Sequence, residues 1–318
     1  MKRIILTVGP SLLHKFPIRN FHQSNYIYRI NGAHGSIGHI RDDLKEIRKQ
    51  VPKAEILIDL PGNKVRTANL KHSIHLDVSK QFSLSNDETN YPGFYAHLKK
   101  GDVVWANDSI FKFTVKQASK REVIFTSHSK GILHNNKGLH VRGIHGAIPF
   151  LFQKDKELIK LANRHEVSHV GLSFVRNIND IKMAKALISK GVQVISKVET
   201  KEAVRNVDSI LKIVDYILVD RGDLSTEIGL EKVPAYQKYI VDRALFYNKK
   251  VFLATQFLKT METNPIPTIA EVVDLYNTFK MGVYGIQLSE ETAIGAHVDK
   301  CLSTLHGMLR EIIHELKS

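Results

Sequence analysis

The sequence predicts a (β/α)8 barrel, the TIM-barrel architecture of the α/β class, with a small β domain inserted after the third barrel strand. Eight short runs rich in β-branched residues alternate with helical patterns. This alternation is typical of parallel βαβ units, and eight such units imply a closed barrel. Between residues 69 and 139 the pattern changes to an alternation with period two, which is typical of antiparallel strands.

The elements follow one another along the chain in a regular order. The predicted strands cover residues 4–8, 26–30, 54–60, 167–174, 192–198, 216–220, 251–255 and 284–288. The predicted helices cover residues 37–50, 155–165, 179–190, 201–213, 234–247, 268–281 and 302–317. We therefore expect the barrel to comprise residues 1–68 and 140–318, and residues 69–139 to form a lid over one end of it.

Composition narrows the class of protein. The chain has 318 residues, of which 43% are hydrophobic and 25% charged, as in an ordinary globular protein. Cys301 is the single cysteine, so no disulfide forms within the chain. We find neither a signal peptide nor a membrane-spanning stretch, and we expect a cytoplasmic protein. The net charge of +14 favours anionic partners such as nucleotides or phosphorylated metabolites. Basic and aromatic residues do not interleave, so nucleic acid is not favoured as a partner.

Polar residues stand at the carboxyl ends of seven predicted strands, where barrel enzymes carry their active sites. In VISKVETKEA, residues 192–201, Lys197 and Glu199 face the same side because side chains alternate along a strand. The full set is Arg29, Asn31, Asp59, Lys64, Arg66, Ser173, Arg176, Lys197, Glu199, Arg221, Gly222, Asp223, Thr255, Gln256, Ser289, Glu290, Glu291 and Thr292. Their convergence on one face predicts a functional site.

The residue types suggest particular chemistry. Glu199 and Asp223 offer two carboxylates for one Mg²⁺ or Mn²⁺, although each alone also fits a surface carboxylate. Lys197 can stabilise a developing negative charge such as an enolate, or simply pair with Glu199, and both roles can hold together. Gly222 permits close backbone approach or serves as a turn residue. Thr255 can relay a proton or bond the backbone.

Other charged and titratable residues are less specific. Arg29, Lys64 and Arg66 suit phosphate groups, with solvated loop charge as the alternative. No phosphate-binding Walker A loop, dinucleotide-binding GxGxxG or cysteine–histidine zinc pattern occurs in the sequence. The following histidines are interpreted as surface or turn residues and not as metal ligands: His34, His134, His140 and His145.

At these residues the sequence resembles the pyruvate kinase family. The segments that carry the resemblance, in the family's order, are ILTVGPS (5–11), YRINGAHGS (28–36), DLPGNKVRT (59–67), NNKGLHVRG (135–143), GLSFVR (171–176), SKVET (196–200), VDRGDLSTEI (219–228), LATQFLKTMETNPIPTIAEVVD (253–274) and QLSEETAIG (287–295). The resemblance covers nearly the whole chain and is most specific around Lys197, Glu199 and Asp223.

The resemblance implies a site for phosphoenolpyruvate. Glu199 and Asp223 would bind the divalent ion, and Lys197 would neutralise charge as the phosphoryl group leaves the enolate. The Gly222 N–H and Thr255 would hold the substrate carboxylate. The remaining implied residues are Arg29 at the phosphate, Ser173 at the substrate, Asn31, His34, Lys64, Arg66 and Lys137 on the nucleotide side, and Ser289 and Glu291 in a proton relay.

The sequence also departs from the family's pattern. Of the four oxygen ligands of the family's K⁺ site, Asn31 and Asp59 remain, whereas Ala33 and Leu60 supply no side-chain oxygen. Lys64 replaces a glutamate, and its ammonium group would substitute for the charge of K⁺, so we predict no K⁺ requirement. The other departures are Pro61 for a lysine, Glu290 for a glycine and Ile269 for an arginine.

The resemblance predicts a glycolytic transferase that moves a phosphoryl group between phosphoenolpyruvate and ADP, giving pyruvate and ATP. The alternative is a divergent enzyme of the same superfamily that uses metal-stabilised enolate chemistry with a different acceptor. The family's carboxyl-terminal regulatory domain has no counterpart in the sequence, so we expect no effector control through it. A homo-oligomer is compatible with the sequence.

Overall fold

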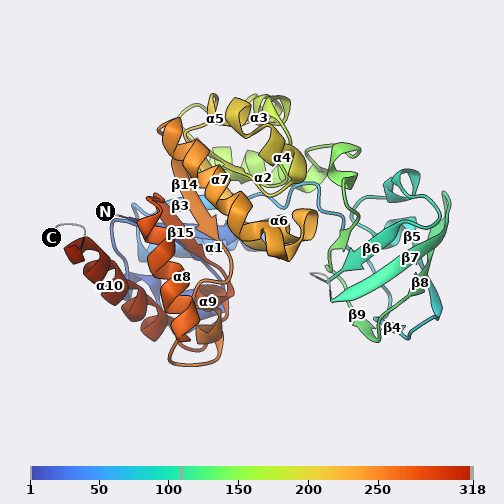
Figure 1. Ribbon diagram of the computed structural model, residues 1–318, viewed down its shortest axis with the longest axis horizontal. Coiled ribbons are helices and arrows are strands. Elements are labelled where there is room, and N and C mark those ends of the chain that lie inside the picture. Colours follow the sequence, from blue (N-terminus) through green and yellow to red (C-terminus); the bar gives the residue numbers. More distant parts are fainter. Residues whose placement is uncertain (1, 108–109, 316–318) are drawn as a thin grey trace.

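Eight parallel strands close into a barrel in the computed structural model, which describes residues 2–107 and 110–315 (Figure 1). The strands, in their order around the barrel, are β1 (Arg3–Thr7), β2 (Tyr26–Asn31), β3 (Glu55–Asp59), β11 (His169–Leu172), β12 (Gln193–Lys197), β13 (Tyr216–Asp220), β14 (Lys250–Ala254) and β15 (Gly285–Leu288). The predicted fold class is confirmed.

Helices surround the strands. They are α1 (Ile37–Gln50), α2 (Gln153–Arg164), α3 (Ile178–Lys185), α4 (Lys201–Arg205), α5 (Val207–Leu211), α7 (Val233–Phe246), α8 (Ile269–Lys280) and α10 (Val298–Glu315). Two further helices, α6 (Arg221–Ile228) and α9 (Glu290–Ala293), begin directly or almost directly after a barrel strand. Local signals explain where the longer helices begin. Ser36 caps α1 by accepting from His39 N at 3.2 Å, and Thr268 caps α8 in a reciprocal capping box with Glu271.

Three predicted helices differ from the structure by more than two residues. The helix expected at residues 179–190 is α3, which ends at Lys185. The helix expected at residues 201–213 is divided at Asn206, whose side chain donates to the Arg176 carbonyl oxygen at 2.9 Å. This tertiary contact holds Asn206 between α4 and α5. The last helix begins at Val298, four residues earlier than predicted. Its predicted end, residues 316 and 317, lies outside the described residues.

Apolar side chains pack against both faces of the barrel wall. Alternate strand residues point outward and pack under the helices in one large cluster. The others point inward and form a separate inner layer, which contains Ile5, Ile27, Leu57, Ile195, Leu218, Phe252 and Ala254. This layer fills the interior of the barrel, so the interior is a packed core. Polar groups occupy the carboxyl ends of the strands beyond it.

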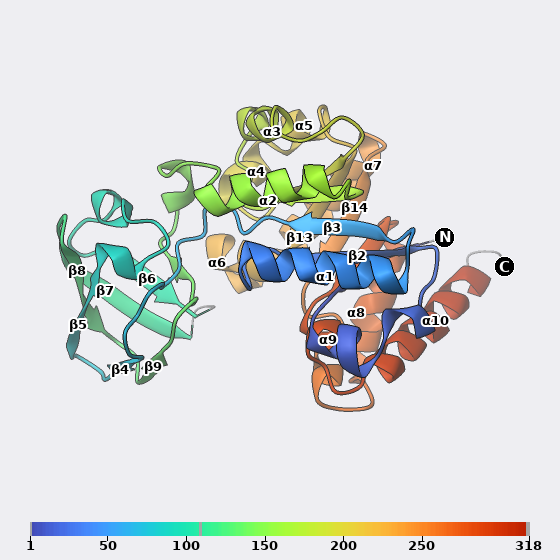
Figure 2. The same cartoon turned by 180° about the vertical axis from the view of Figure 1, so that it is seen from behind.

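The segment between β3 and α2 forms a β domain beside the barrel (Figures 1 and 2). Its strands are β4 (Ile74–Leu76), β5 (Gln81–Ser85), β6 (Val103–Ala106), β7 (Phe111–Ala118), β8 (Glu122–Ser127), β9 (Gly131–Leu133) and β10 (Leu139–His140). In the described residues β10, β6, β7, β8 and β5 make one antiparallel sheet, and β4 pairs with β9. The domain has its own apolar core, which includes Phe113 and Phe125.

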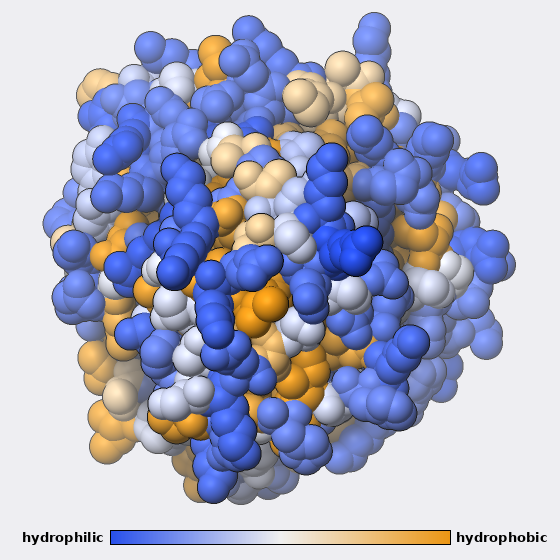
Figure 3. All heavy atoms as spheres, turned by 90° about the vertical axis from the view of Figure 1, so that its right-hand side faces the viewer, coloured by the Kyte–Doolittle hydropathy of each residue, from blue (hydrophilic) through white to orange (hydrophobic). Residues whose placement is uncertain are grey.

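The face of the molecule on the β-domain side is mostly hydrophilic, with small groups of apolar side chains between the polar ones (Figure 3). No helix in the described part of the chain has the length and apolar character needed to cross a membrane.

Candidate active site

The alternation that fills the barrel also builds its polar mouth. Side chains two residues apart on a strand face the same side, so each strand carries a polar residue one layer above the apolar one. Two residues beyond Ile5, Ile27, Leu57, Ile195 and Leu218 stand Thr7, Arg29, Asp59, Lys197 and Asp220. All five polar residues are buried. The carboxyl ends of neighbouring strands thus bring charged groups from distant parts of the sequence together.

Lys197 lies at the centre of this layer. Its Nζ is 3.3 Å from Glu199 Oε2, 3.6 Å from Asp59 Oδ2 and 3.8 Å from Asp220 Oδ2. It also donates to Ser173 Oγ at 3.0 Å. Burial alone would lower the pKa of Lys197, but the surrounding carboxylates outweigh it and raise the pKa above its usual value. The group is therefore a fixed cation.

Arg29 forms the adjacent cation. Its Nε donates to Asp59 Oδ2 at 2.8 Å, its Nη2 lies 2.7 Å from the same oxygen, and its Nη1 donates to Thr7 Oγ1 at 2.9 Å. Burial opposes ionisation of Asp59, but Lys197 and Arg29 overcome it and lower the pKa of this carboxyl. Asp59 therefore orients both cations toward the mouth.

Glu199, Asp220 and Asp223 form a cluster of carboxylates beside Lys197, and we call it the carboxylate trio. One oxygen of each lies within 4.8 Å of the others. Glu199 is fully buried; its Oε1 accepts from Phe174 N at 2.7 Å, while Oε2 has no hydrogen-bond partner among the residues described. Hard oxygen donors in this number suit Mg²⁺ or Mn²⁺. Glu199 and Asp223 are the ligands predicted from the sequence, and Asp220 is an addition from the structure.

The three carboxylates titrate differently because their neighbours differ. Burial raises the pKa of Glu199, and burial together with the charge of Asp223 raises that of Asp220. Burial would also raise the pKa of Asp223, yet Lys64 and Lys197 lower it well below its usual range. Lys64 is the nearest cause, because its Nζ donates to Asp223 Oδ1 at 2.7 Å.

A turn on the other side of the carboxylate trio brings Gly222 and Thr255 together. The Gly222 N–H points to Asp220 Oδ1 at 3.1 Å and to Thr255 Oγ1 at 3.0 Å. Thr255 has a φ of +74°, which is rare for a β-branched residue and is typical of strained functional turns. Arg221 supports the turn by donating from Nε to the Thr255 carbonyl oxygen at 3.1 Å. A backbone N–H and a hydroxyl thus meet at the mouth.

Of the residues predicted for the nucleotide side, Lys64, Arg66 and Lys137 lie on the connections between the barrel and the β domain, whereas Asn31 ends β2 and His34 lies between β2 and α1. Burial and the charges of Arg66 and Arg29 lower the pKa of His34. Arg66 and Thr67 lie on the segment that leaves the barrel, and Asn136 and Lys137 lie on the segment that returns to it. Arg66 donates to the Asn136 carbonyl oxygen at 3.2 Å. Thr67 N donates to the Lys137 carbonyl oxygen at 2.9 Å. The Asn31 side chain accepts from Ala33 N at 3.1 Å and is occupied in a turn.

The end of β15 carries the residues predicted for a proton relay. Ser289 N donates to Glu291 Oε2 at 2.6 Å, and Glu291 Oε1 has no partner within the described part of the chain. Burial raises the pKa of Glu291 to about 7, so this carboxyl exchanges protons near neutral pH. Glu290 is exposed and its charge acts on His34. Ile269, in contrast, is 83% exposed.

One prediction about histidines is wrong in part. His34 and His134 are exposed, as predicted, but His140 and His145 are buried, with 8% and 4% of their surface exposed. His140 ends the last strand of the β domain and packs against α6, and His145 stacks on Phe174 with ring centroids 4.3 Å apart. Their burial cannot be predicted from the local sequence, because the residues that cover them are remote in the chain.

Comparisons with known proteins agree on one family. The family model described as "Pyruvate kinase, barrel domain" matches residues 1–301. The chain is 33% identical to the pyruvate kinase of Thermotoga maritima, with 99% of this chain and 72% of that protein covered. It is 34% identical to the pyruvate kinase of Thermococcus litoralis, with 93% of this chain and 66% of that protein covered. It is 30% identical to that of Borreliella burgdorferi, with 98% and 68% covered.

Proposed function

This chain belongs to the pyruvate kinase family, and we propose that it transfers a phosphoryl group between phosphoenolpyruvate and ADP with Mg²⁺ or Mn²⁺ as cofactor. The observation that carries the proposal is the buried Lys197, held between Asp59 and Glu199 beside the carboxylate trio. Phosphoryl transfer needs positioning and charge stabilisation more than covalent chemistry, and this mouth offers both.

The residues present fit a hard divalent cation. The carboxylate trio offers only oxygen donors, and one of them, Glu199 Oε2, is buried with no hydrogen bond among the described residues and an ion pair to Lys197 Nζ at 3.3 Å. Glu199 and Asp223 would hold the ion, with Asp220 as a third donor or as support. The ion would supply positive charge to the phosphate and enolate oxygens of the substrate.

The chain's own groups would bind and polarise the substrate. Lys197 would stabilise the oxygen that gains negative charge as the phosphoryl group departs, and its fixed protonation suits this role. Arg29 and Ser173 lie in the same layer and would orient the phosphate. The N–H of Gly222 and the hydroxyl of Thr255 would both donate to the substrate carboxylate. These bonds would replace the one from Gly222 N to Thr255 Oγ1 at 3.0 Å and the one from Thr255 Oγ1 to the Ala254 carbonyl oxygen at 2.6 Å.

The β domain would act as a lid on the nucleotide side. Asn31, His34, Arg66 and Lys137 would face the nucleotide and its phosphates, and closure would exclude the water that competes for the phosphoryl group. Ser289 and Glu291 would relay the proton that converts enolate into pyruvate, because Glu291 holds or releases a proton near pH 7. Lys64 would supply the charge that K⁺ provides elsewhere in the family.

A coupled assay tests the proposal. Pyruvate formation from phosphoenolpyruvate and ADP, followed through NADH oxidation by lactate dehydrogenase, should require Mg²⁺ or Mn²⁺ and should proceed in K⁺-free buffer. A Lys197→Met variant should lose the activity. No turnover by the wild-type protein with either divalent ion would refute the proposed reaction.

A different phosphoryl acceptor is the second candidate. The observation that favours it is the exposed carboxylate of Glu290, whose negative charge favours the protonated form of His34 on the side where the nucleotide would lie. Thermal unfolding separates the two candidates, because a bound ligand raises the melting temperature. Stabilisation by oxalate with Mg²⁺ and also by ADP supports the proposed reaction. Stabilisation by oxalate with Mg²⁺ but not by ADP supports the second candidate.

A further inference from the structure

A second group of buried polar side chains lies where the β domain returns to the barrel. His140 ends β10, His145 lies in the 3-10 turn Ile144–Gly146, and Glu227 lies near the end of α6. One ligand atom of each residue lies within 4.8 Å of the others. α6 is on the side of the barrel that faces the β domain in both ribbon views (Figures 1 and 2). We call His140, His145 and Glu227 the His–His–Glu cluster.

Asn63 fixes the orientation and the tautomer of His145. The Asn63 amide nitrogen donates to the His145 carbonyl oxygen at 3.2 Å, so its Oδ1 is the atom that faces His145 Nδ1 at 2.9 Å. An amide oxygen only accepts hydrogen bonds, so Nδ1 carries the proton and Nε2 presents a lone pair. Partners of this kind orient the imidazoles that bind metals.

The atoms that point into the cluster are buried, and apart from the 3.3 Å contact between His140 Nε2 and Glu227 Oε1 they have no polar partner among the described residues. His140 Nε2, His145 Nε2 and Glu227 Oε1 make no hydrogen bond to any residue that the structure describes, although buried polar atoms are nearly always paired. The residues are 8%, 4% and 9% exposed. The other carboxylate oxygen of Glu227 accepts from Lys201 N at 3.4 Å, which leaves Oε1 directed at the imidazoles.

The spacing of two of these atoms and the chemistry of all three fit a tetrahedral metal ion. His140 Nε2 lies 3.3 Å from Glu227 Oε1. Ligands about 2.0–2.1 Å from a tetrahedral ion lie about 3.3–3.4 Å from each other. An imidazole in its neutral form, which is the form that binds metals, presents one ring-nitrogen lone pair.

We propose that His140, His145 and Glu227 bind one borderline transition-metal ion, with Zn²⁺ the best match, and that this ion joins the return segment of the β domain to α6. Two imidazoles and one carboxylate are a zinc donor set, whereas Mg²⁺ prefers oxygen ligands. The site therefore differs from the carboxylate trio in the metal it selects. Because α6 also carries Gly222 and Asp223, the ion would hold β10 against the helix that builds the mouth.

Cobalt substitution tests the proposal on the intact chain. The metal-free protein is titrated with Co²⁺ in excess Mg²⁺, which occupies the oxygen-only carboxylate trio and leaves imidazole ligands free. We expect one equivalent of Co²⁺ to give the intense visible bands of tetrahedral coordination, and Zn²⁺ to remove them by displacement. His145→Asn and Glu227→Gln should each weaken Co²⁺ binding by at least about tenfold, the smallest loss that even outer-shell changes cause.

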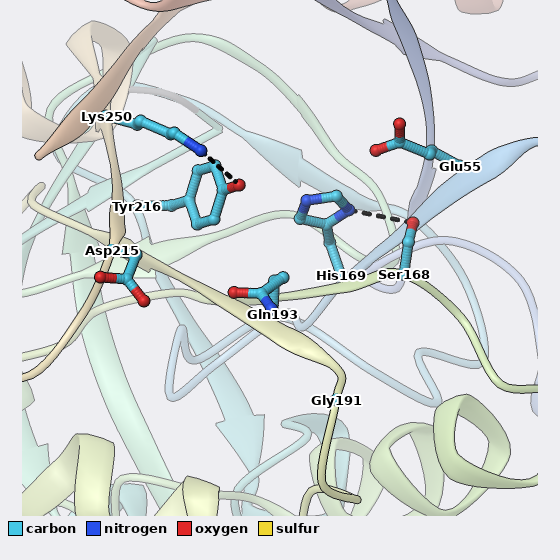
Figure 4. Close-up of a pocket in the computed structure, with 8 residues that line it drawn as sticks. All are labelled: Glu55, Ser168, His169, Gly191, Gln193, Asp215, Tyr216 and Lys250. Carbon is cyan, nitrogen blue, oxygen red and sulfur yellow. Dashed lines mark hydrogen bonds between the residues drawn. The ribbon is translucent and has the colours of Figure 1, made fainter.

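A buried histidine at the opposite end of the barrel provides the matched control. His169 is 4% exposed and bonds Ser168 Oγ at 2.9 Å in the hollow at the amino ends of the strands (Figure 4). His169→Asn should leave Co²⁺ binding unchanged. Circular dichroism establishes that each variant is folded, and Glu227→Gln preserves side-chain shape if His145→Asn does not fold.

Three outcomes would overturn the proposal. The first is weak, octahedral Co²⁺ bands that excess Mg²⁺ abolishes, because the ion would then occupy the carboxylate trio. The second is Co²⁺ binding that a folded Glu227→Gln variant retains at full strength. The third is an equal loss of binding in the His169→Asn control.

Discussion

Replacement of Lys197 by methionine should impair both catalysis and folding, with a dependence on pH that identifies the cause. The ammonium group is buried within 3.8 Å of three carboxylates. Removing one partner from a buried ion pair costs about 3–5 kcal/mol, because it leaves uncompensated charge. Loss of a preorganised charge at a reacting oxygen costs about 10²–10³-fold in kcat. We expect Lys197→Met to show both losses.

The pH dependence follows from the carboxylates that remain. Without Lys197, Asp59 and Glu199 lose an attractive charge in the folded state, so their folded-state pKa values rise above those in the wild type. Asp59, whose pKa is lowered in the wild type, accounts for the change below about pH 8, because the pKa of Glu199 is already raised to about 8 there. The folded variant then retains protons that the unfolded chain releases, and its stability falls as pH rises through those pKa values. The difference in unfolding free energy between wild type and Lys197→Met should therefore grow between about pH 5 and about pH 8.

Urea unfolding at several pH values, together with the coupled assay, measures both effects. Lys250→Met is the control, since Lys250 is an exposed lysine at the opposite rim whose Nζ contacts Tyr216 Oη at 3.1 Å (Figure 4). Lys250→Met should change the free energy of unfolding by less than about 1 kcal/mol and leave kcat unchanged. The reasoning is refuted if Lys197→Met keeps kcat within about tenfold of wild type, or if its loss of stability is the same at every pH.

Three other changes test the site. Lys64→Glu should make the activity depend on K⁺, because it removes the ammonium group 2.7 Å from Asp223 Oδ1; a wild-type enzyme that itself requires K⁺ would contradict this. Gly222→Ala should fold normally, because its Cβ would lie 3.4 Å from the nearest atom, Asp220 Oδ1. The added methyl group crowds the N–H, so KM for phosphoenolpyruvate should rise at least about tenfold. An unchanged KM would exclude Gly222 from the substrate site. Burial raises the folded-state pKa of Glu291 to about 7, so the proton it holds stabilises the fold at low pH and this contribution is lost as pH rises through 7. The free energy of unfolding of Glu291→Gln, measured in urea, should therefore increase relative to that of the wild type by up to about 3 kcal/mol between about pH 5 and about pH 8. A difference that is independent of pH would contradict the raised pKa.

The fold could be predicted because each of its signals is local. Alternation within β2 or β12 marks a strand, and the apolar period within α1 marks a helix, without knowledge of any other element. The site could be predicted in part for the same reason. Lys197 and Glu199 stand two residues apart, so their shared direction follows from strand geometry alone, and the structure places their charged atoms 3.3 Å apart.

What the sequence concealed depends on contacts between remote segments. The pairing of Arg29 with Asp59 requires the register between β2 and β3, which places Asn31 opposite Asp59. The division of the helix at Asn206 requires a carbonyl group thirty positions earlier in the chain. Asp220 is different, because a local signal existed: it stands two residues beyond the inward-facing Leu218 and could have been assigned to the mouth.

The crowding of carboxylates around Lys197 explains why one site can hold both a cation and a phosphorylated anion. Asp59 is committed to Arg29 and Lys197, and Asp223 is paired with Lys64, so the charge that remains to be balanced lies on Glu199 and Asp220. The raised pKa values of these two groups show that their ionised forms are poorly compensated. The site can relieve this in two ways, by holding a proton or by binding a divalent cation. A cation that displaces the proton adds positive charge where an anionic substrate must bind, so metal binding and substrate binding should strengthen each other.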